Sequence, residues 1–228
     1  MGSPNNLRHI PRVVVRFSDQ NLIPIPEAKN LGIIFDRHLN WTSHVSYIIR
    51  RCVGMLNGLS HLRNYLPPSV VSSVVHALVL SQIRYCISVY GNGTKKNVTR
   101  IKKVVNYAAK VIFGRKKFDH VSDLLENLGW LNASELISYH TLCLTHKVRR
   151  MGEPETIVRA LPRFSENCDR MTRQNDDFCV PMSYTEMGRR RFCCRAARQY
   201  NSLPTELRYM SIPAFGRHLR NYLVCDRD

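Results

Sequence analysis

Residues 29–44 read Lys-Asn-Leu-Gly-Ile-Ile-Phe-Asp-Arg-His-Leu-Asn-Trp-Thr-Ser-His, and they divide the chain into two kinds of sequence. Residues 31–35 form a short apolar run rich in β-branched and aromatic side chains, which predicts a buried strand. Gly32 within this run indicates that another backbone approaches closely. A segment of turn composition follows, and Asn40 or Thr42 is expected to cap a long helix. The stretch therefore predicts a junction at which a strand leads into a helical domain.

Short strands are expected before this junction. Residues 12–17, Arg-Val-Val-Val-Arg-Phe, are one strand candidate, and a polar turn separates them from a second candidate at residues 22–25. Pro24 favours an edge position for that second strand, because proline cannot donate a hydrogen bond to a neighbouring strand. Together with residues 31–35 they would form a small antiparallel sheet, which is only marginally stable by itself.

Nearly everything after the junction has the apolar period of helices. Pro67-Pro68, the turn Gly91-Asn92-Gly93 and Gly114 mark breaks between helices, and Thr94 is placed to cap one of them. Asn132, followed by Glu135, resembles a capping box. The expected helices span residues 42–65, 68–90, 94–113, 120–127, 132–150, 153–161, 188–200 and 213–224, with a linker at 162–177 and an extended segment at 178–181. The predicted fold class is mainly α, with a small N-terminal antiparallel β element, a helical bundle and a helical C-terminal extension.

The composition indicates a folded, basic protein. The chain has 228 residues, of which 44% are hydrophobic, and its net charge is +17, from 34 Lys+Arg against 17 Asp+Glu. Such an excess of positive charge favours a polyanionic partner, most often nucleic acid. A merely basic soluble protein, or one that touches an acidic membrane surface, remains the alternative on charge alone.

Eight cysteines do not form a recognisable zinc or disulfide pattern. No C-x-x-C pair occurs, and Cys52, Cys86 and Cys143 lie among apolar neighbours, as small core residues do. No apolar run approaches the roughly 20 residues that a membrane-spanning helix needs, so no membrane partner is expected. Without a signal peptide, a reducing compartment is favoured, and we expect the protein in the cytoplasm and nucleus.

The sequence contains almost none of the residue patterns that are typical of a catalytic site. There is no glycine-rich phosphate loop and no metalloprotease or hydrolase motif. The only adjacent acidic pair, Asp176-Asp177, lies in the polar linker without flanking strands, so a solvated loop is a better interpretation than a metal site. We therefore expect no catalytic residue, no metal site and no cofactor in this chain.

Clusters of cations are the more informative feature, because long cationic side chains neutralise phosphates and release counterions. Tyr47, Tyr107, Phe118, Phe192 and Tyr200 lie near them in sequence and could stack on bases, although aromatic side chains more often pack in the core. Each basic cluster could equally be a solvated helix face. The predicted nucleic-acid-binding residues are Lys29, Arg50, Arg51, Lys95, Lys102, Lys103, Arg115, Lys116, Arg189, Arg190 and Arg191, with Arg195 and Arg198 extending the last cluster.

A series of short motifs follows in a characteristic order from residue 29 onward. They are residues 29–36 and 39–45, Tyr65-Leu66-Pro67-Pro68, Ala77-Leu78-Val79, Arg84-Tyr85-Cys86, Val89-Tyr90-Gly91, residues 107–112, His120-Val121 with Leu128-Gly129-Trp130-Leu131, and residues 200–208. Each motif is weak alone. Their order and spacing resemble the end of the reverse-transcriptase domain of non-LTR retrotransposons, and the jockey-like and CR1-like LINE elements are the nearest in pattern.

The resemblance implies three segments. Residues 1–40 would be the end of the palm with a primer-grip-like hairpin, residues 41–161 a thumb-like helical domain, and residues 162–228 a basic C-terminal extension. The family's catalytic aspartates lie upstream of this region, and no Ala-Asp-Asp box occurs here. The chain therefore looks like a C-terminal fragment of an RNA-directed DNA polymerase that is inactive alone, with Mg²⁺ expected only in the full-length enzyme. The implied partners are RNA, an RNA–DNA hybrid and the rest of the polymerase chain.

Two other classes of function stay open at this point. The chain could be a catalytically inactive helical interaction module, derived from a retroelement, that acts through protein contacts. It could also be a complete enzyme whose site has no recognisable motif.

Overall fold

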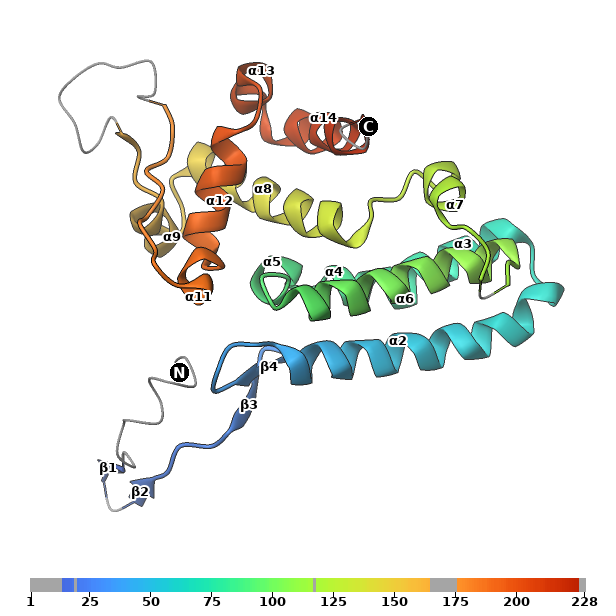
Figure 1. Cartoon of the computed structure of the whole chain (residues 1–228), viewed down its shortest axis with the longest axis horizontal. Helices are drawn as coiled ribbons and strands as arrows, with labels where there is room; N and C mark the ends of the chain where they lie inside the picture. The colour runs from blue at the N-terminus through green and yellow to red at the C-terminus, as the bar shows by residue number, and fades with distance from the viewer. Residues whose placement is uncertain (1–13, 19, 117, 165–175, 226–228) are drawn as a thin grey trace. The chain divides into compact units, whose positions relative to one another are not determined.

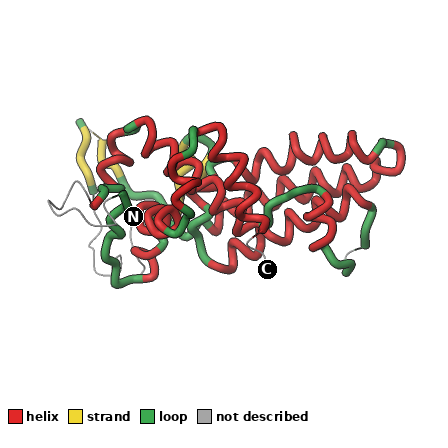
Figure 2. Tube along the Cα trace, turned by 90° about the horizontal axis from the view of Figure 1, so that it is seen from above, coloured by secondary structure: helices red, strands yellow, loops and turns green. Residues whose placement is uncertain are grey.

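Helices make up most of the structure, a computed structural model that describes residues 14–18, 20–116, 118–164 and 176–225. Figure 1 labels its elements in chain order, and Figure 2 shows how little of the trace is strand. The predicted fold class is confirmed, because a small antiparallel β element at the N-terminus precedes a series of helices. Packing divides the chain into two compact units, which we describe separately. Unit 1 is residues 1–86 and 93–117, and unit 2 is residues 87–92 and 118–228.

Four short strands in unit 1 form two antiparallel hairpins. β1 (Val15–Phe17) pairs with β2 (Gln20–Leu22), and β3 (Glu27–Asn30) pairs with β4 (Ile33–Asp36). The described strands thus form two separate two-stranded sheets, whereas the sequence predicted one sheet of three. β3 is formed by residues 27–30, for which no strand was predicted, and residues 23–25 of the predicted second strand lie outside any strand. Residues 12–13 of the first predicted strand lie outside the described residues.

The predicted strand at residues 31–35 begins two residues too early. Asn30 pairs with Ile33, so Leu31 and Gly32 form the two-residue turn of the β3–β4 hairpin. Their φ angles are 45° and 81°. Positive φ at both central residues matches the right-handed twist of the two strands, as in a type I′ turn, and Gly32 adopts it without steric cost.

A buried carboxylate connects this hairpin to the first long helix. Asp36, at the end of β4, accepts backbone hydrogen bonds at Oδ1 from His38 (2.9 Å) and Asn40 (3.0 Å), and at Oδ2 from Trp41 (2.6 Å). The N-cap residue is Trp41, with φ 63° and no side-chain capping bond. The predicted cap by Asn40 or Thr42 is therefore wrong, and Asp36 instead binds the backbone of the residues that lead into the helix.

The helices of unit 1 begin and end close to the predicted caps and helix-breaking residues. Thr94 caps α6 by accepting a bond from the backbone of Asn97, and Gly114 ends it with φ 66°. The predicted helix 68–90 is instead interrupted by a π-helical stretch, and it breaks at Tyr85 and Cys86, where the φ of Cys86 is 52°. The elements are α2 (Thr42–Leu62), η1 (Arg63–Tyr65), α3 (Pro68–Val75), η2 (His76–Leu80), α4 (Ser81–Arg84) and α6 (Lys95–Phe113).

α2 and α6 run side by side in the same direction (Figure 1). The amide Nδ2 of Asn97 donates to the carbonyl of Asn40 (2.8 Å) near the start of both helices, and Tyr107 Oη donates to Asn57 Oδ1 (2.8 Å) further along. The apolar faces of α2, α3, η2 and α6 supply the core of this unit, which contains Cys52, Leu56, Val71, Val75, Val79, Ile101, Val105 and Ala108. Burial of these faces stabilises helices of this length more than their intrinsic propensity does.

Unit 2 contains the remaining helices, and the chain enters it first through α5 (Ile87–Tyr90). Asn132 and Glu135 form the predicted capping box at the start of α8. The predicted basic helix 188–200 is broken at Arg190 and Arg191, and α13 was not predicted. The further elements are α7 (Ser122–Asn127), α8 (Ala133–Met151), α9 (Glu155–Ala160), α11 (Glu186–Arg189), α12 (Phe192–Asn201), α13 (Thr205–Tyr209) and α14 (Ile212–Cys225).

The two units do not coincide with the three segments implied by the resemblance. α8 packs with α12 and α14, so residues on both sides of the expected linker share one core. The division into residues 1–40, 41–161 and 162–228 stays a prediction about function. Residues 165–175, which form most of the expected linker, lie outside the described residues.

A buried histidine lies at the centre of unit 2. The ring of His146 stacks on Phe215, with centroids 3.9 Å apart and an interplanar angle of 6°. Its Nδ1 lies 2.8 Å from Tyr200 Oη and its Nε2 lies 3.0 Å from the carbonyl of Met210. Since a carbonyl can only accept, Nε2 carries the proton and Nδ1 accepts from the tyrosine. Burial lowers the pKa of His146 to about 4, so the ring is neutral in the folded chain.

Unit 2 is expected to lose stability on acidification. An unfolded histidine protonates near pH 6.5, whereas His146 in the fold resists protonation until about pH 4. Its contribution is therefore complete above pH 6.5 and is lost as the pH falls towards 4, with a maximum of roughly 3 kcal/mol. Trp130 reports on this unit once Trp41 is replaced by Phe, so urea unfolding followed by its fluorescence measures the effect. His146→Gln should flatten the pH dependence, and an unchanged slope would contradict this account.

Unit 1 is expected to depend on the Asp36 carboxylate. Asp36→Ala leaves three backbone donors without their acceptor, which should cost roughly 2–4 kcal/mol of the free energy of unfolding. Asp36→Asn keeps one acceptor oxygen and should cost about half as much. Trp41 fluorescence in a Trp130→Phe background follows this unit during urea unfolding. Equal stability of the Ala and Asn variants would show that the carboxylate is not what holds the turn.

Candidate nucleic-acid interface

A long stretch of the sequence, most of it in unit 1, has no acidic residues. Between Asp36 and Asp119 there is no Asp or Glu, and there are fourteen Lys and Arg. The net charge of the whole chain and the local clusters of cations do not reveal this uneven distribution. The signal was visible in the sequence, because it needs only the positions of the carboxylates.

The predicted cations are almost all exposed. In unit 1 they are Lys29 on β3, Arg50 and Arg51 on α2, Lys95, Lys102 and Lys103 on α6, and Arg115 and Lys116 just after the end of α6. In unit 2, Arg189 and Arg191 are exposed at the break between α11 and α12, and Arg190 is half-buried. Exposure leaves these charges able to meet a partner, but it does not by itself bring them together.

Two contacts across α2 and α6 bring some of them onto one face. Arg100 Nη2 donates to Ser46 Oγ (3.0 Å), and Tyr107 donates to Asn57 eleven residues further along α2. One helical turn separates Arg50 from Ser46, and Lys103 lies between Arg100 and Tyr107 on the α6 stripe. Arg50, Arg100 and Lys103 therefore lie along one seam, in which Arg50 and Lys103 are exposed and Arg100 is half-buried. We call this seam the α2–α6 basic face. Arg100 was not among the predicted site residues, and its three-residue spacing from Lys103 is the signal that could have identified it.

The other predicted cations on α6 and just after its C-terminus are distributed along the full length of the helix. Lys95 and Lys102 are seven residues apart, so they share a neighbouring stripe of the helix. Arg115 and Lys116 follow Gly114, and the 19 residues of α6 separate them from Lys95 by about 28 Å. The Arg63 guanidinium lies against Gly114 and adds a further cation at this end of the helix. Unit 1 thus carries positive charge along the whole length of α6.

A second arrangement joins β3, α2 and α4. Arg51 Nη1 donates to Tyr47 Oη (2.9 Å), its guanidinium carbon lies 5.6 Å from the centroid of the Tyr47 ring, and Lys29 Nζ lies 5.4 Å from it. The hydrogen bond from Arg51, then the charges of Arg51 and Lys29, lower the pKa of Tyr47. These residues, with Gly32 and Tyr85, line an open pocket of about 320 Å³, which we call the Tyr47 pocket. Among the described residues no carboxylate lines it.

Arg195 does not belong to the exposed cluster in which the sequence placed it. Its Nη2 donates to the carbonyl of Ser88 (3.0 Å) and to Thr141 Oγ1 (3.1 Å), and burial lowers its pKa to about 10. The side chain therefore links α12 to α5 and α8 inside unit 2. Arg198, in contrast, is exposed.

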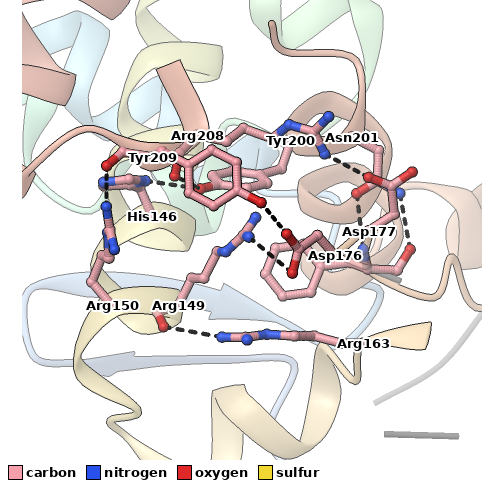
Figure 3. Close-up of polar contacts among 11 residues, drawn as sticks. His146, Arg149, Arg150, Arg163, Asp176, Asp177, Tyr200, Asn201, Arg208 and Tyr209 are labelled. Atoms are coloured by element: carbon pink, nitrogen blue, oxygen red, sulfur yellow. Dashed lines mark hydrogen bonds and ion pairs between the residues drawn. The ribbon is translucent and has the colours of Figure 1, made fainter. Parts of the chain in front are cut away.

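The Asp176-Asp177 pair is engaged with arginines (Figure 3). Arg208 Nη1 lies 2.5 Å from Asp177 Oδ1, and Arg149 Nη2 lies 3.7 Å from Asp176 Oδ1. The hydrogen bond from Tyr209 is the main cause that lowers the pKa of Asp176. Asp176 is exposed, as the expected solvated loop requires, and the arginines add ion pairs that the sequence did not predict. Within the described part of the chain, no three metal-ligating side chains come together.

The C-terminal motif at residues 200–208 has a structural explanation. Asn201 Oδ1 accepts from the backbone of Phe178 (3.0 Å) and its Nδ2 donates to the Phe178 carbonyl (2.9 Å), as a neighbouring strand would. Tyr200 is fully buried against His146, and Leu203 is buried beside it. Tyr200 is thus a core residue and does not stack on bases. Tyr107 is held by Asn57, whereas Phe118 is 90% exposed.

Comparison with protein-family models, with curated proteins and with solved structures found no match for this chain. The similarity to non-LTR reverse transcriptases, which rests on short motifs in order, therefore stays a hypothesis. None of the described helices is long and apolar enough to cross a membrane.

Arg195 and Arg198 provide a matched pair that separates a structural from a surface arginine. Arg195→Gln removes the donor to Ser88 and Thr141 and should lower the free energy of unfolding of unit 2 by roughly 2–3 kcal/mol. Arg198→Gln, three residues along the same helix, should change it by less than about 0.5 kcal/mol. Urea unfolding followed by Trp130 in the Trp41→Phe background measures both. Similar losses in the two variants would contradict the structural role of Arg195.

Proposed function

We propose that unit 1 binds the sugar–phosphate backbone of nucleic acid, as the thumb of a reverse transcriptase holds an RNA or RNA–DNA template–primer. The observation that carries the proposal is the stretch between Asp36 and Asp119, whose many cations have no carboxylate among them. Exposed cations without acidic neighbours repel each other in the free protein. A polyphosphate removes that repulsion and releases counterions when it binds.

The α2–α6 basic face gives the proposal a location. Arg50, Arg100 and Lys103 lie along one seam of two parallel helices, and such a row of cations suits a row of phosphates. Contacts of this kind carry no sequence information, which is what a polymerase thumb requires. Lys95, Lys102, Arg115 and Lys116 extend the positive charge along α6. In unit 2, Arg189 and Arg191 are the cations placed to add backbone contacts.

The proposal assigns no catalytic step to this chain. The ion pairs of Asp176 and Asp177 with Arg149 and Arg208 support a structural role for the one adjacent acidic pair. Any synthesis by a larger polymerase would use carboxylates and Mg²⁺ held elsewhere.

Charge reversal tests the location. The double variant Arg50→Glu/Lys103→Glu should weaken binding of a short RNA–DNA hybrid by roughly 10- to 100-fold, and it should reduce the slope of log K against log[salt] by about 2. The matched control is Lys147→Glu/Arg217→Glu, which makes the same change in net charge at two exposed positions of unit 2. Fluorescence anisotropy between about 50 and 200 mM salt measures affinity and slope.

The result can contradict the proposal in two ways. If the control pair weakens binding as much as the face variant, the effect is one of net charge and the α2–α6 face is not the site. If the unmodified chain binds the hybrid without a steep salt slope, phosphate contacts do not drive binding. That second result would favour the alternative, a helical module that acts through protein contacts.

A further inference from the structure

The Tyr47 pocket lies between the β3–β4 hairpin and helices α2 and α4. It is distinct from the α2–α6 basic face, because none of the three residues of that face lines the pocket. Its volume of about 320 Å³ is near the lower end of pockets that hold small ligands, roughly 300–1,000 Å³. A single nucleotide is a ligand of this size class, whereas a duplex is far larger. The pocket therefore suits one nucleotide unit and not a paired segment.

Two cations are fixed at this pocket by an aromatic ring. Lys29 and Arg51 both lie within 6 Å of the centroid of the Tyr47 ring, and Arg51 also donates a hydrogen bond to the Tyr47 hydroxyl. Neither cation forms an ion pair within the described residues. Glu27, on the same strand as Lys29, accepts a hydrogen bond from Ser43 instead. Two preorganised cations without a carboxylate partner are suited to a phosphate group.

The hairpin tip beside the pocket carries an exposed apolar side chain in an unfavourable conformation. Leu31 is 82% exposed and has φ 45°, where a non-glycine residue is uncommon. Tyr85 Oη donates to the Leu31 carbonyl (2.8 Å), and the Tyr85 ring lies over Gly32, 3.5 Å from where a Cβ would be. Local strain of this kind is retained where the surrounding structure holds it, often at binding sites. Tyr85 itself is 53% exposed and its ring is available for a further contact.

We propose that the Tyr47 pocket takes the first unpaired nucleotide at the end of a duplex. Its base contacts the Tyr85 ring, its phosphate contacts Lys29 and Arg51, and Leu31 packs against the last base pair. Aromatic rings stack on any base, and apolar side chains that meet a base step act as wedges in other nucleic-acid complexes. The inference rests on the proposed function, since it names the part of a nucleic acid that unit 1 recognises.

The test compares nucleic-acid ends that differ by one nucleotide. The probes are a blunt RNA–DNA hybrid, the same hybrid with one overhanging nucleotide, the same overhang without its base, and adenosine monophosphate beside inorganic phosphate. The unmodified chain should bind the overhang roughly 5- to 100-fold tighter than the blunt end, and the abasic overhang should lose most of that gain. Adenosine monophosphate should bind more tightly than inorganic phosphate, because only the nucleotide offers a base.

Two variants at one position assign the preference to the pocket. Tyr85→Leu removes the ring and should abolish the preference for the overhang while leaving binding to the blunt hybrid within about twofold. Tyr85→Phe keeps the ring, loses only the bond to the Leu31 carbonyl, and should keep most of the preference. Thermal unfolding of both variants checks that the chain remains folded. A preference that survives Tyr85→Leu overturns the inference.

The outcomes separate this inference from the proposed function. Equal binding of blunt and overhanging hybrids, with the salt slope intact, overturns the pocket assignment and leaves backbone binding standing. Binding of adenosine monophosphate that Tyr85→Leu abolishes, without measurable binding of any duplex, supports a nucleotide pocket and overturns backbone binding by unit 1. Equal affinity for adenosine monophosphate and inorganic phosphate overturns base recognition and identifies an anion site only.

Discussion

The carboxylate of Asp36 is the interaction on which unit 1 depends. It accepts three backbone hydrogen bonds from the five residues between β4 and α2, and so it fixes the angle at which the hairpin meets the helix. Trp41, the last of the three donors, is buried, and α2 starts directly after it. The Tyr47 pocket requires this arrangement, because β3 supplies Lys29 and α2 supplies Arg51. One buried acid thus determines how the cations on the two elements are placed.

Charge is used differently in the two units. In unit 2, Arg149, Arg159 and Arg208 form ion pairs with carboxylates. Arg195, which is half-buried there, donates to two oxygen acceptors, neither of which is a carboxylate. In unit 1 most cations of the stretch between Asp36 and Asp119 are exposed, and that stretch contains no carboxylate of its own. Such uncompensated charge opposes compactness, and its retention is easier to explain by an external polyanion than by stability.

Features that depend on neighbouring residues could be predicted from the sequence, whereas contacts between distant residues could not. Thr94, Gly114 and the pair Asn132–Glu135 act through neighbouring residues, and the structure confirms each as a helix boundary. The turn at Leu31 and Gly32 was not predicted, because these two residues continue directly into the apolar residues of β4 and were assigned to the same strand. Arg195 was misplaced because its partners on α5 and α8 are far away in the sequence. The basic face depends on which stripes of α2 and α6 are adjacent, and helical periodicity alone does not specify that.

The resemblance motifs and the packing coincide at several positions. Asp36, Trp130, Tyr200 and Asn201 all belong to motifs, and each has a buried or hydrogen-bonded role in its own unit. Residues of this kind hold a fold without specifying a reaction. The motifs therefore bear on shape, and the proposed activity depends on exposed cations that the motifs mostly do not include.

The short helix α5 makes the two units inseparable in sequence. The chain leaves unit 1 after residue 86, contributes α5 to unit 2, returns at residue 93 and leaves again after residue 117. Ile87 and Tyr90 are each only 1% exposed, so α5 is part of an interior and not a tether. A truncation that begins at residue 118 would lack those two side chains and the Ser88 carbonyl that accepts from Arg195. One cut after residue 117 keeps every residue of unit 1 but removes α5 from unit 2. During synthesis, α5 therefore waits without its partners until the later helices of unit 2 have left the ribosome.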